Sequence, residues 1–294
     1  MHIETHSDAL KLYESTRGPW EDIGLVDFNP GGYDAEILQG INHFRRDRPK
    51  WVLRDAGHQD YLLKTLLRSP NLRGVIANIT DHKRMEQLRN WGGPVIDLSG
   101  MLPDSPFPQL SSTPGAIGKM GARHLHEKGL NKILYVSGMN WNFELDRWQG
   151  VRTYCVEHNL PAWWWVWSEN KCMDCVHADP LPTLHDSSPF SAYHFLTQIE
   201  KPFGAFVAMD RMAVQICDGC RYHDLKIPEE VAILGVDNNP YYCESCTPPL
   251  SSVMMPGQEI GFHAAEMLDK MIKGEDVPPF TRLDPVGITE RAST

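Results

Sequence analysis

Acidic residues follow several apolar runs in this sequence, at the point where each run stops. The clearest case is VAILGVD, in which Asp237 closes the run. In doubly wound sheets, ligands bind outside the carboxyl ends of the strands. The residues placed there by this rule are Asp27, Asp97, Gly138, Asp210 and Asp237. This edge is therefore a candidate ligand site, although an aspartate after a strand can equally cap the next helix.

Six of the seven cysteines form three CxxC pairs, which are Cys172 with Cys175, Cys217 with Cys220, and Cys243 with Cys246. Two such pairs can complete a tetrahedral four-cysteine zinc site. The last two pairs follow neighbouring strands and are the candidate zinc ligands, and the first pair, in an expected loop, could replace either. The alternative is that these thiols are free and pack as small apolar residues.

The candidate residues sit in a regular alternation of apolar runs and helical patterns. Strands are expected at residues 22–28, 51–55, 73–79, 94–100, 132–138, 162–168, 204–210, 231–237, 251–255 and 281–291. Apolar strands alternating with amphipathic helices indicate parallel sheets covered on both faces. About ten strands favour two sheets, because one sheet usually holds about four to six. The expected fold class is α/β, with two doubly wound parallel sheets.

Composition and charge exclude several classes of function. The chain has 38 acidic against 28 basic residues, a net charge of −10, which argues against DNA binding by this chain itself. No apolar run reaches transmembrane length and the N-terminus lacks a signal-peptide pattern, so a cytoplasmic location and no membrane partner are expected. An odd number of cysteines fits a reducing compartment. No enzyme motif is found, and we expect a protein that is not an enzyme.

One long segment carries a family resemblance. The run PEEVAILGVDNNPYYCESCTPPLSSVMMPGQEIGFHAAEMLDKMIKG resembles the C-terminal third of the effector-binding domain of LacI/GalR repressors. Upstream, GARHLHEKGLNKILYVSG, DRWQGVRTYC and GAFVAMDRMAV follow in that family's order. The resemblance spans roughly residues 22–291 and is strongest to the xylose-operon activator (XylR) branch. In that branch the sugar-binding fold precedes an AraC-type DNA-binding domain.

The resemblance implies a periplasmic-binding-protein-like fold, with two lobes joined by three crossovers and a ligand cleft between them. The implied divisions are an N-terminal extension at 1–21, a first lobe at 22–125 plus 254–275, and a second lobe at 126–253 plus 276–294. A helix-turn-helix domain is expected after residue 294 and is absent from this chain.

Site residues follow from the resemblance one at a time. Arg147, in DRWQG, matches the arginine that grips the effector, and a guanidinium suits this role because its fixed donors can fork two oxygens. Asp237 matches the aspartate that accepts hydrogen bonds from sugar hydroxyls. Asp210, which closes the preceding apolar strand GAFVAMD, is also expected to contact the effector. Met209 departs from the family, since many relatives carry a polar residue there.

Two further segments are expected at the effector. Tyr33 and Asp34 lie on the turn after the first strand, where relatives offer side chains to the ligand. Trp141 and Asn142 flank the segment of the binding arginine, and an aromatic ring there could pack against a sugar face. Trp148 could do the same or could be buried in the core.

The resulting hypothesis is a sugar-sensing domain of a bacterial transcription regulator, with xylose or a related pentose as effector. The resemblance implies a homodimer that reaches DNA only through a domain outside this chain. No cofactor is required, and structural zinc is the one metal considered. The alternative function is a solute-binding protein of a sugar transporter, against which the missing signal-peptide pattern counts.

Overall fold

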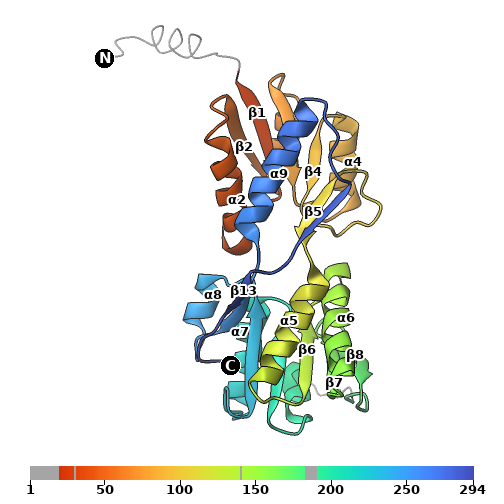
Figure 1. Cartoon of the computed structure of the whole chain (residues 1–294), viewed down its shortest axis with the longest axis vertical. Coiled ribbons are helices and arrows are strands. Elements are labelled where there is room, and N and C mark those ends of the chain that lie inside the picture. The colour runs from red at the N-terminus through yellow and green to blue at the C-terminus, as the bar shows by residue number, and fades with distance from the viewer. Residues whose placement is uncertain (1–19, 30, 140, 183–190) are drawn as a thin grey trace, which may run out of the picture. The chain divides into compact units, whose positions relative to one another are not determined.

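The computed structural model describes residues 20–29, 31–139, 141–182 and 191–294 (Figure 1). Most of the predicted N-terminal extension, residues 1–21, lies outside the described residues. Within the described chain, no helix is both long and apolar enough to cross a bilayer. The described residues divide into two compact units: unit 1 contains 20–29, 37–110 and 258–281, and unit 2 contains 31–36, 111–257 and 282–294.

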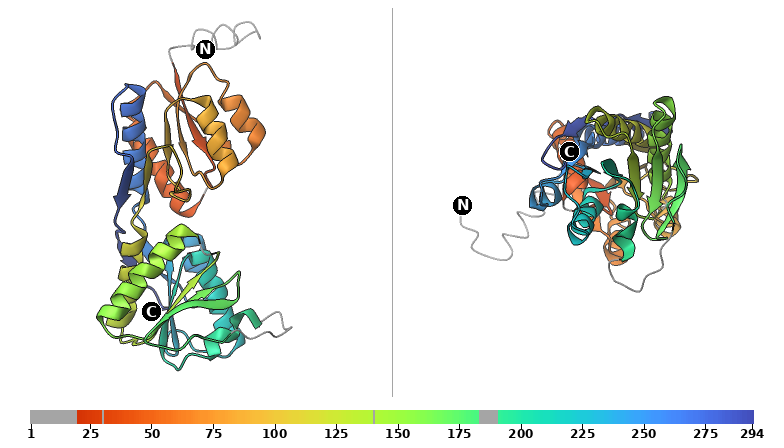
Figure 2. Two further views of the ribbon diagram at one scale, coloured as in Figure 1. Left: turned by 90° about the vertical axis from the view of Figure 1, so that its right-hand side faces the viewer. Right: turned by 90° about the horizontal axis from the view of Figure 1, so that it is seen from below.

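Unit 1 is built on a six-stranded sheet. Its strand order is β12 (Phe280–Leu283), β5 (Gln109–Ser112), β4 (Val95–Asp97), β3 (Leu72–Ala77), β1 (Glu21–Val26) and β2 (Trp51–Gly57). Its helices are α2 (Gly32–Arg45), α3 (Asp60–Leu66), α4 (His82–Trp91) and α9 (Gly257–Ile272). In Figure 2 the blue helix α9 lies on one side of this sheet and the orange helices α3 and α4 lie on the other. The predicted doubly wound arrangement is therefore present in unit 1.

Helices α2 and α9 pack backbone to backbone. A Cβ atom at Gly40 would overlap the carbonyl oxygen of Gln258, and one at Gly261 would overlap that of Ile37. Both close approaches require glycine, because any larger side chain would force the helices apart.

Unit 2 is built on a seven-stranded sheet. Its strand order is β13 (Gly287–Thr289), β11 (Ser251–Met254), β10 (Val231–Val236), β9 (Phe203–Val207), β6 (Ile133–Ser137), β7 (Ala162–Val166) and β8 (Lys171–Val176). Its helices are α5 (Pro114–Glu127), α6 (Asn142–Glu157), the 3₁₀ helix η1 (Ser191–Thr197), α7 (Asp210–Tyr222) and α8 (Pro240–Ser245). The inner strands pair in parallel, whereas β8 and β13 pair antiparallel at the edges.

The two faces of this sheet bury different cores. Strand β7 alternates, with Trp164 in the cluster under α5 and α6, and Trp163 and Trp165 in the cluster under α7 and η1. The period of two places successive strand residues on opposite faces, which explains why a run of apolar residues is buried along its whole length.

Helix α5 belongs to unit 2, not to the first lobe as predicted. A Cβ at Gly118 would overlap the carbonyl oxygen of Arg147 on α6, and one at Gly150 would overlap that of Gly115. This contact ties α5 to α6, so the division near residue 125 is corrected to one between 110 and 111. Two further corrections are that the segment 31–36 groups with unit 2 and that residues 276–281 group with unit 1.

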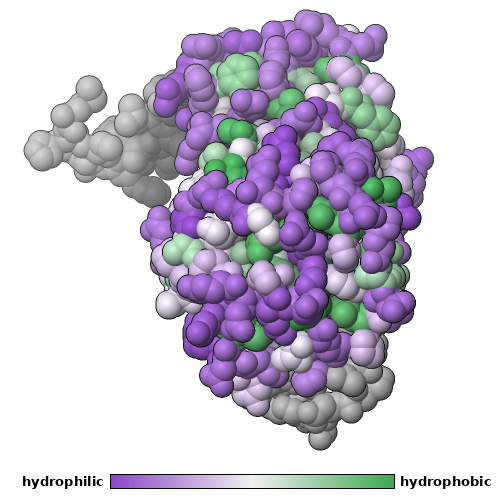
Figure 3. Space-filling model, turned by 60° about the horizontal axis from the view of Figure 1, so that its bottom comes forward, coloured by the Kyte–Doolittle hydropathy of each residue, from purple (hydrophilic) through white to green (hydrophobic). Residues whose placement is uncertain are grey.

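Three elements differ from the sequence prediction. The loop expected at 101–114 contains β5, and the loop expected around Cys172 and Cys175 contains β8. The single strand expected at 281–291 is two strands, β12 and β13, which lie in different sheets. On the face seen in Figure 3, hydrophobic residues are scattered among hydrophilic ones, as is common for protein surfaces.

Candidate functional site

The sheet of unit 2 reverses its winding between β6 and β9. Strand β6 leads through α6 to β7 on one side, whereas β9 leads through α7 to β10 on the other. The carboxyl ends of these neighbouring strands are the topological switch point, where ligands of doubly wound sheets bind. The side chains that meet there come from α6, α7 and the turn after β10, together with the segment 31–36.

Glu144 fixes the turn between β6 and α6. Its side chain is fully buried and accepts hydrogen bonds from the backbone N–H groups of Gly138 at 2.7 Å, Met139 at 3.1 Å and Trp141 at 3.0 Å. A buried carboxylate with three backbone donors is well compensated. The sequence prediction missed Glu144, although a glutamate at the third position of a helix is a known sign of reciprocal capping.

Arg147 lies one turn further along α6 and is 5% exposed. Its Nη1 donates to the carbonyl oxygen of Ala208 at 2.5 Å, and its Cζ lies 5.0 Å from the ring centroid of Phe143. The Nε atom is buried and has no hydrogen-bond partner among the described residues. The guanidinium is therefore held by Ala208 and Phe143, and among the described residues its Nε donor stays unused.

The side chain of Asp210 is buried and fully engaged by the protein. One oxygen accepts from the Ser252 hydroxyl at 2.6 Å, and the other accepts from the Asn239 N–H at 2.7 Å and the Cys243 thiol at 3.3 Å. Burial raises its pKa to about 6, against the lowering effect of these hydrogen bonds. Asp210 therefore holds the turn after β10 through these three hydrogen bonds, and its predicted contact with an effector stays a prediction.

Asp237 stands on a turn with an unusual backbone. Its φ is 105° and that of Asn238 is 47°, a conformation that costs energy in residues other than glycine. The turn is held because the Asn238 N–H donates to the Ser252 hydroxyl at 2.9 Å and Arg291 donates to the Asn238 side chain at 3.0 Å. The surrounding contacts thus fix the position of the half-buried Asp237 side chain.

The electrostatic surroundings of Asp237 connect the predicted residues. Burial, followed by the charge of Asp210, raises the pKa of Asp237 to about 8, and Arg147 opposes this rise. Burial and the charge of Asp237 also raise the pKa of Tyr33, while Arg147 lowers it. Asp34 acts on both groups. Arg147, Asp237, Tyr33 and Asp34 therefore lie within electrostatic range of one another.

The two other predicted residues lie at the start of α6. Trp141 is half-buried, with its ring centroid 5.6 Å from that of Phe143, and Asn142 is exposed. Trp148 is fully buried and stacks with Tyr135 and Trp164, so it belongs to the core. The aromatic ring that contacts the site arginine is therefore Phe143, which the sequence analysis did not select.

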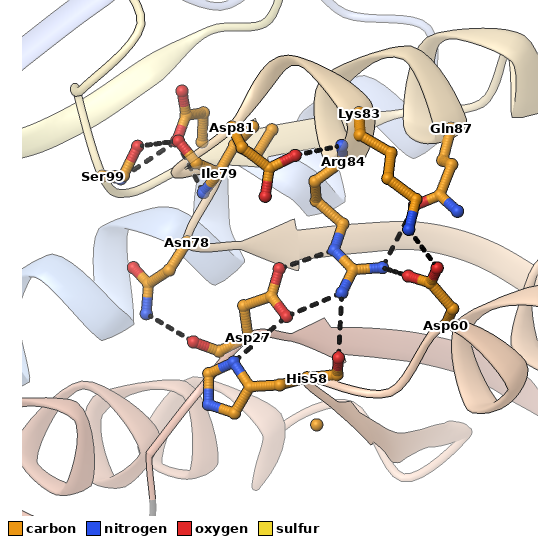
Figure 4. A network of polar contacts seen from close by, with 12 residues as sticks. Asp27, His58, Asp60, Asn78, Ile79, Asp81, Lys83, Arg84, Gln87 and Ser99 are labelled. Carbon is orange, nitrogen blue, oxygen red and sulfur yellow. Dashed lines mark hydrogen bonds and ion pairs between the residues drawn. The ribbon is translucent and has the colours of Figure 1, made fainter.

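In unit 1, the charge of Asp27 at the end of β1 is compensated by side chains of the same unit (Figure 4). Arg84 of α4 binds both oxygens of Asp27, at 2.7 Å and 3.0 Å, and the two side chains are 7% and 9% exposed. His58 lies 3.2 Å from the same carboxylate, and Arg84 also contacts Asp60 at 3.5 Å. This bidentate ion pair leaves Asp27 a structural residue.

Asp97, at the end of β4, also forms its hydrogen bonds within unit 1. It is fully buried and accepts from the N–H and the hydroxyl of Ser99, each at 2.9 Å. Burial raises its pKa, and the Ser99 hydrogen bonds oppose this rise. The acidic strand ends thus divide into Asp237, which faces the switch-point residues, and three aspartates engaged by their own unit.

The cysteines do not converge as the predicted four-ligand set. Cys217 and Cys246 are buried in the core cluster under α7, whereas Cys243 donates to Asp210. Cys220 lies one turn after Cys217 on α7 and is buried in the same core cluster. Over the described ranges, no group of three or more histidine, cysteine or acidic side chains could hold a metal ion. Within the part of the chain that the structure describes, the predicted zinc therefore has no group of three or more such side chains to hold it.

The remaining pair, Cys172 and Cys175, lies on β8. A bulge opposite Trp164 and Trp165 leaves Met173 without a register partner and places both cysteines against the core under α7. Burial raises the pKa of both thiols. Cys172 and Cys175 therefore pack as partly buried side chains.

Comparison with known proteins agrees with this fold. The model of the periplasmic binding protein-like domain matches residues 122–294. The xylose operon regulatory protein of Haemophilus influenzae is 23% identical over 279 residues, covering 89% of this chain and 67% of that protein. Catabolite control protein A of Priestia megaterium is 32% identical over 256 residues, covering 83% and 72%. The solved structure of the xylose-binding transcription activator xylR has a TM-score of 0.73 at 20% identity, covering 92% and 69%.

The chain therefore belongs to the periplasmic binding protein-like family, in the form that serves as the effector-binding domain of LacI/GalR-type regulators. The predicted family and fold class are confirmed. The chain spans about two thirds of the length of the xylose operon regulatory proteins that it matches.

Proposed function

We propose that this domain binds a neutral sugar, xylose or a related pentose, at the switch point of unit 2. The observation that carries the proposal is the buried Nε of Arg147, which has no hydrogen-bond partner among the described residues, while Nη1 is held by the carbonyl oxygen of Ala208. A buried donor without a partner costs about 1–3 kcal/mol, which a ligand oxygen would recover.

The surrounding groups favour a polyol over an anion. Asp237 lies in the field of Arg147 but also of Asp210, Asp34 and Glu36, so acidic groups outnumber the one arginine. A sugar hydroxyl both donates and accepts, and it can therefore bind Arg147 and Asp237 at once. The rings of Phe143 and Trp141 supply apolar area beside these polar groups.

The pentose assignment rests on the names of the relatives. The Haemophilus influenzae relative is a xylose operon regulatory protein, and a structural neighbour is a xylose-binding transcription activator. By analogy, we propose that the whole protein is a cytoplasmic, homodimeric transcription regulator with an AraC-type DNA-binding domain. Binding of the sugar would alter how that domain meets DNA. The proposed sensing requires no catalysis and no cofactor.

A thermal-shift screen against monosaccharides tests the proposal. A ligand that binds only the folded chain at about a hundredfold excess over its Kd stabilises it by about 2.7 kcal/mol. We expect a rise in Tm with xylose or another pentose and its loss in Arg147→Ala. The matched control is Arg123→Ala, which removes a 56% exposed arginine of the same unit. A shift that survives in Arg147→Ala, or no shift with any sugar, would refute this site.

A further inference from the structure

The C-terminal segment, residues 290–294, is anchored inside unit 2. The carbonyl oxygen of Ser293 accepts from the Ile233 N–H at 2.7 Å, and the Ser293 hydroxyl donates to the Ile233 carbonyl oxygen at 2.6 Å. The Ser251 N–H donates to the same hydroxyl at 2.8 Å, and Ser293 is fully buried. The segment that follows β13 is therefore held against both β10 and β11.

Arg291 connects this segment to the turn that carries Asp237. Its backbone N–H donates to the Ser251 hydroxyl at 2.8 Å, which fixes the backbone of the arginine. Its Nη1 donates to the carbonyl oxygen of Leu250 at 2.8 Å, and its Nη2 donates to the side-chain oxygen of Asn238 at 3.0 Å. The half-buried arginine therefore spans from the C-terminal segment to the residue next to Asp237.

We propose that Arg291 is the positioning residue through which the C-terminal segment and the effector site act on each other. The proposal rests on the function proposed above, because it takes Asp237 as a group that binds the effector. Asp237 and Asn238 have positive φ angles, a conformation that depends on support from neighbouring groups. A sugar bound to Asp237 and an arginine bound to Asn238 both favour this one conformation. Each interaction therefore strengthens the other, and such coupling is reciprocal by thermodynamic necessity.

The consequence is a signal at the C-terminal segment. A bound sugar holds the turn, the turn holds the Arg291 side chain, and this side chain holds the backbone after β13. When the site is empty, the same segment is held less firmly. In the whole protein proposed above, the DNA-binding domain would follow this segment, and it would sense the order of residues 290–294.

Hydrogen–deuterium exchange of the sugar-free chain, followed by mass spectrometry, tests the connection. The turn contains three hydrogen-bonded backbone N–H groups, those of Asp237, Asn238 and Asn239. We expect Arg291→Ala to accelerate exchange at these groups about fivefold or more, the lower end of typical coupling between sites. The peptide that covers β6, in the middle of the same sheet, should exchange as in the wild-type chain.

Two further variants complete the set. Arg291→Lys keeps the charge but replaces the fork of donors by one ammonium group, so its exchange should lie between that of the wild-type chain and that of Arg291→Ala. Arg282→Ala removes a 55% exposed side chain that lies 3.9 Å from Asp146, and it should leave the turn unchanged. Circular dichroism checks folding, and the lysine variant carries the test if the alanine variant unfolds. Unchanged exchange at the turn in the folded Arg291 variant, or equal acceleration in Arg282→Ala, would overturn the proposal.

Xylose provides a second measurement, which separates this proposal from the function on which it rests. If xylose raises the Tm of the wild-type chain, it should also slow exchange in the peptide that contains residues 290–294. Arg291→Ala should then weaken xylose binding about fivefold or more. A Tm shift without either effect would contradict the coupling. No Tm shift with any sugar would refute the proposed function, whereas the sugar-free exchange still decides whether Arg291 holds the turn.

Discussion

The hydroxyl of Ser252 bridges Asp210 and the turn after β10. It donates to Asp210 at 2.6 Å and accepts from the N–H of Asn238 at 2.9 Å. Since Asn238 and Asp237 both have positive φ angles, the turn depends on contacts from outside itself. Asp210, at the start of α7, therefore helps to set the position of Asp237, which follows β10.

The first prediction concerns this bridge. Asp210→Ala leaves the Ser252 hydroxyl and the Asn239 N–H without their acceptor, and each such buried group costs about 1–3 kcal/mol. We expect the free energy of urea unfolding to fall by about 3 kcal/mol. Asp218→Ala, which removes a 56% exposed side chain from the same helix, is the control. Equal unfolding midpoints for the two variants would contradict the role given to Asp210.

The second prediction compares two glycines of α5. Alanine at Gly118 would place its Cβ onto the backbone of Arg147, whereas alanine at Gly115 meets its nearest atom at 3.7 Å. We expect Gly118→Ala to displace α6 and lose several kcal/mol of stability together with sugar binding. Gly115→Ala should be neutral or gain up to about 1 kcal/mol, because alanine favours the helix. Thermal unfolding with and without sugar measures both effects.

The third prediction is a pH dependence. Between the ordinary carboxyl pKa near 4 and about 8, the folded chain keeps a proton on Asp237 that the unfolded chain has released. The contribution of Asp237 to the free energy of unfolding therefore falls as the pH rises through this window. Asp210 contributes in the same sense only up to about pH 6.

Asp237→Asn isolates the upper part of that window. The groups that act on Asp237 are Asp210, Arg147, Asp34 and Glu36, and all remain in the variant. The difference between the wild-type and variant unfolding curves should therefore change with pH between about 6 and 8. Urea titrations at several pH values measure it, and a difference that stays constant over this range would show that Asp237 titrates normally.

The fourth prediction concerns the buried ion pair of unit 1. Arg84→Ala leaves Asp27 as an uncompensated buried charge, which costs about 3–5 kcal/mol. Arg89→Ala, on the same helix, removes a 64% exposed side chain and should cost less than about 1 kcal/mol. Urea unfolding distinguishes the two. Near-equal losses would mean that water or His58 compensates Asp27.

The sequence predicted those features that depend on local patterns. Strands such as Val231–Val236 are buried along their length and read directly as apolar runs. Strand β8 was missed because KCMDCV mixes polar and apolar residues at an antiparallel edge, and its pairing with β7 is not a local property. The assignment of α5 to unit 2 was missed because α5 packs on α6 through glycines of both helices, and hydrophobic periodicity does not reveal such a contact.

The residue types at the candidate site could be predicted from the sequence, but the separate roles of its aspartates could not. Arg147 and Asp237 lie within electrostatic range of each other. Asp210 has the same sequence context as Asp237, a carboxylate after an apolar strand, yet its oxygens face Ser252 and Asn239. Which strand-end acid is free depends on tertiary donors far away in the sequence.

The close contact of α5 with α6 limits how this domain can acquire a new specificity. The backbone that carries Arg147 rests on Gly118, and that of Gly115 rests on Gly150, so selection for another effector has little freedom to relocate the arginine. Met209 is different, since it is half-buried and its methyl group lies 3.9 Å from the Cβ position of Gly138, at the switch point. A library that varies Met209 and Trp141 while preserving the glycines should therefore yield folded variants with altered sugar preference. In such a library the backbones of α5 and α6 would stay in place while the side chains around them change.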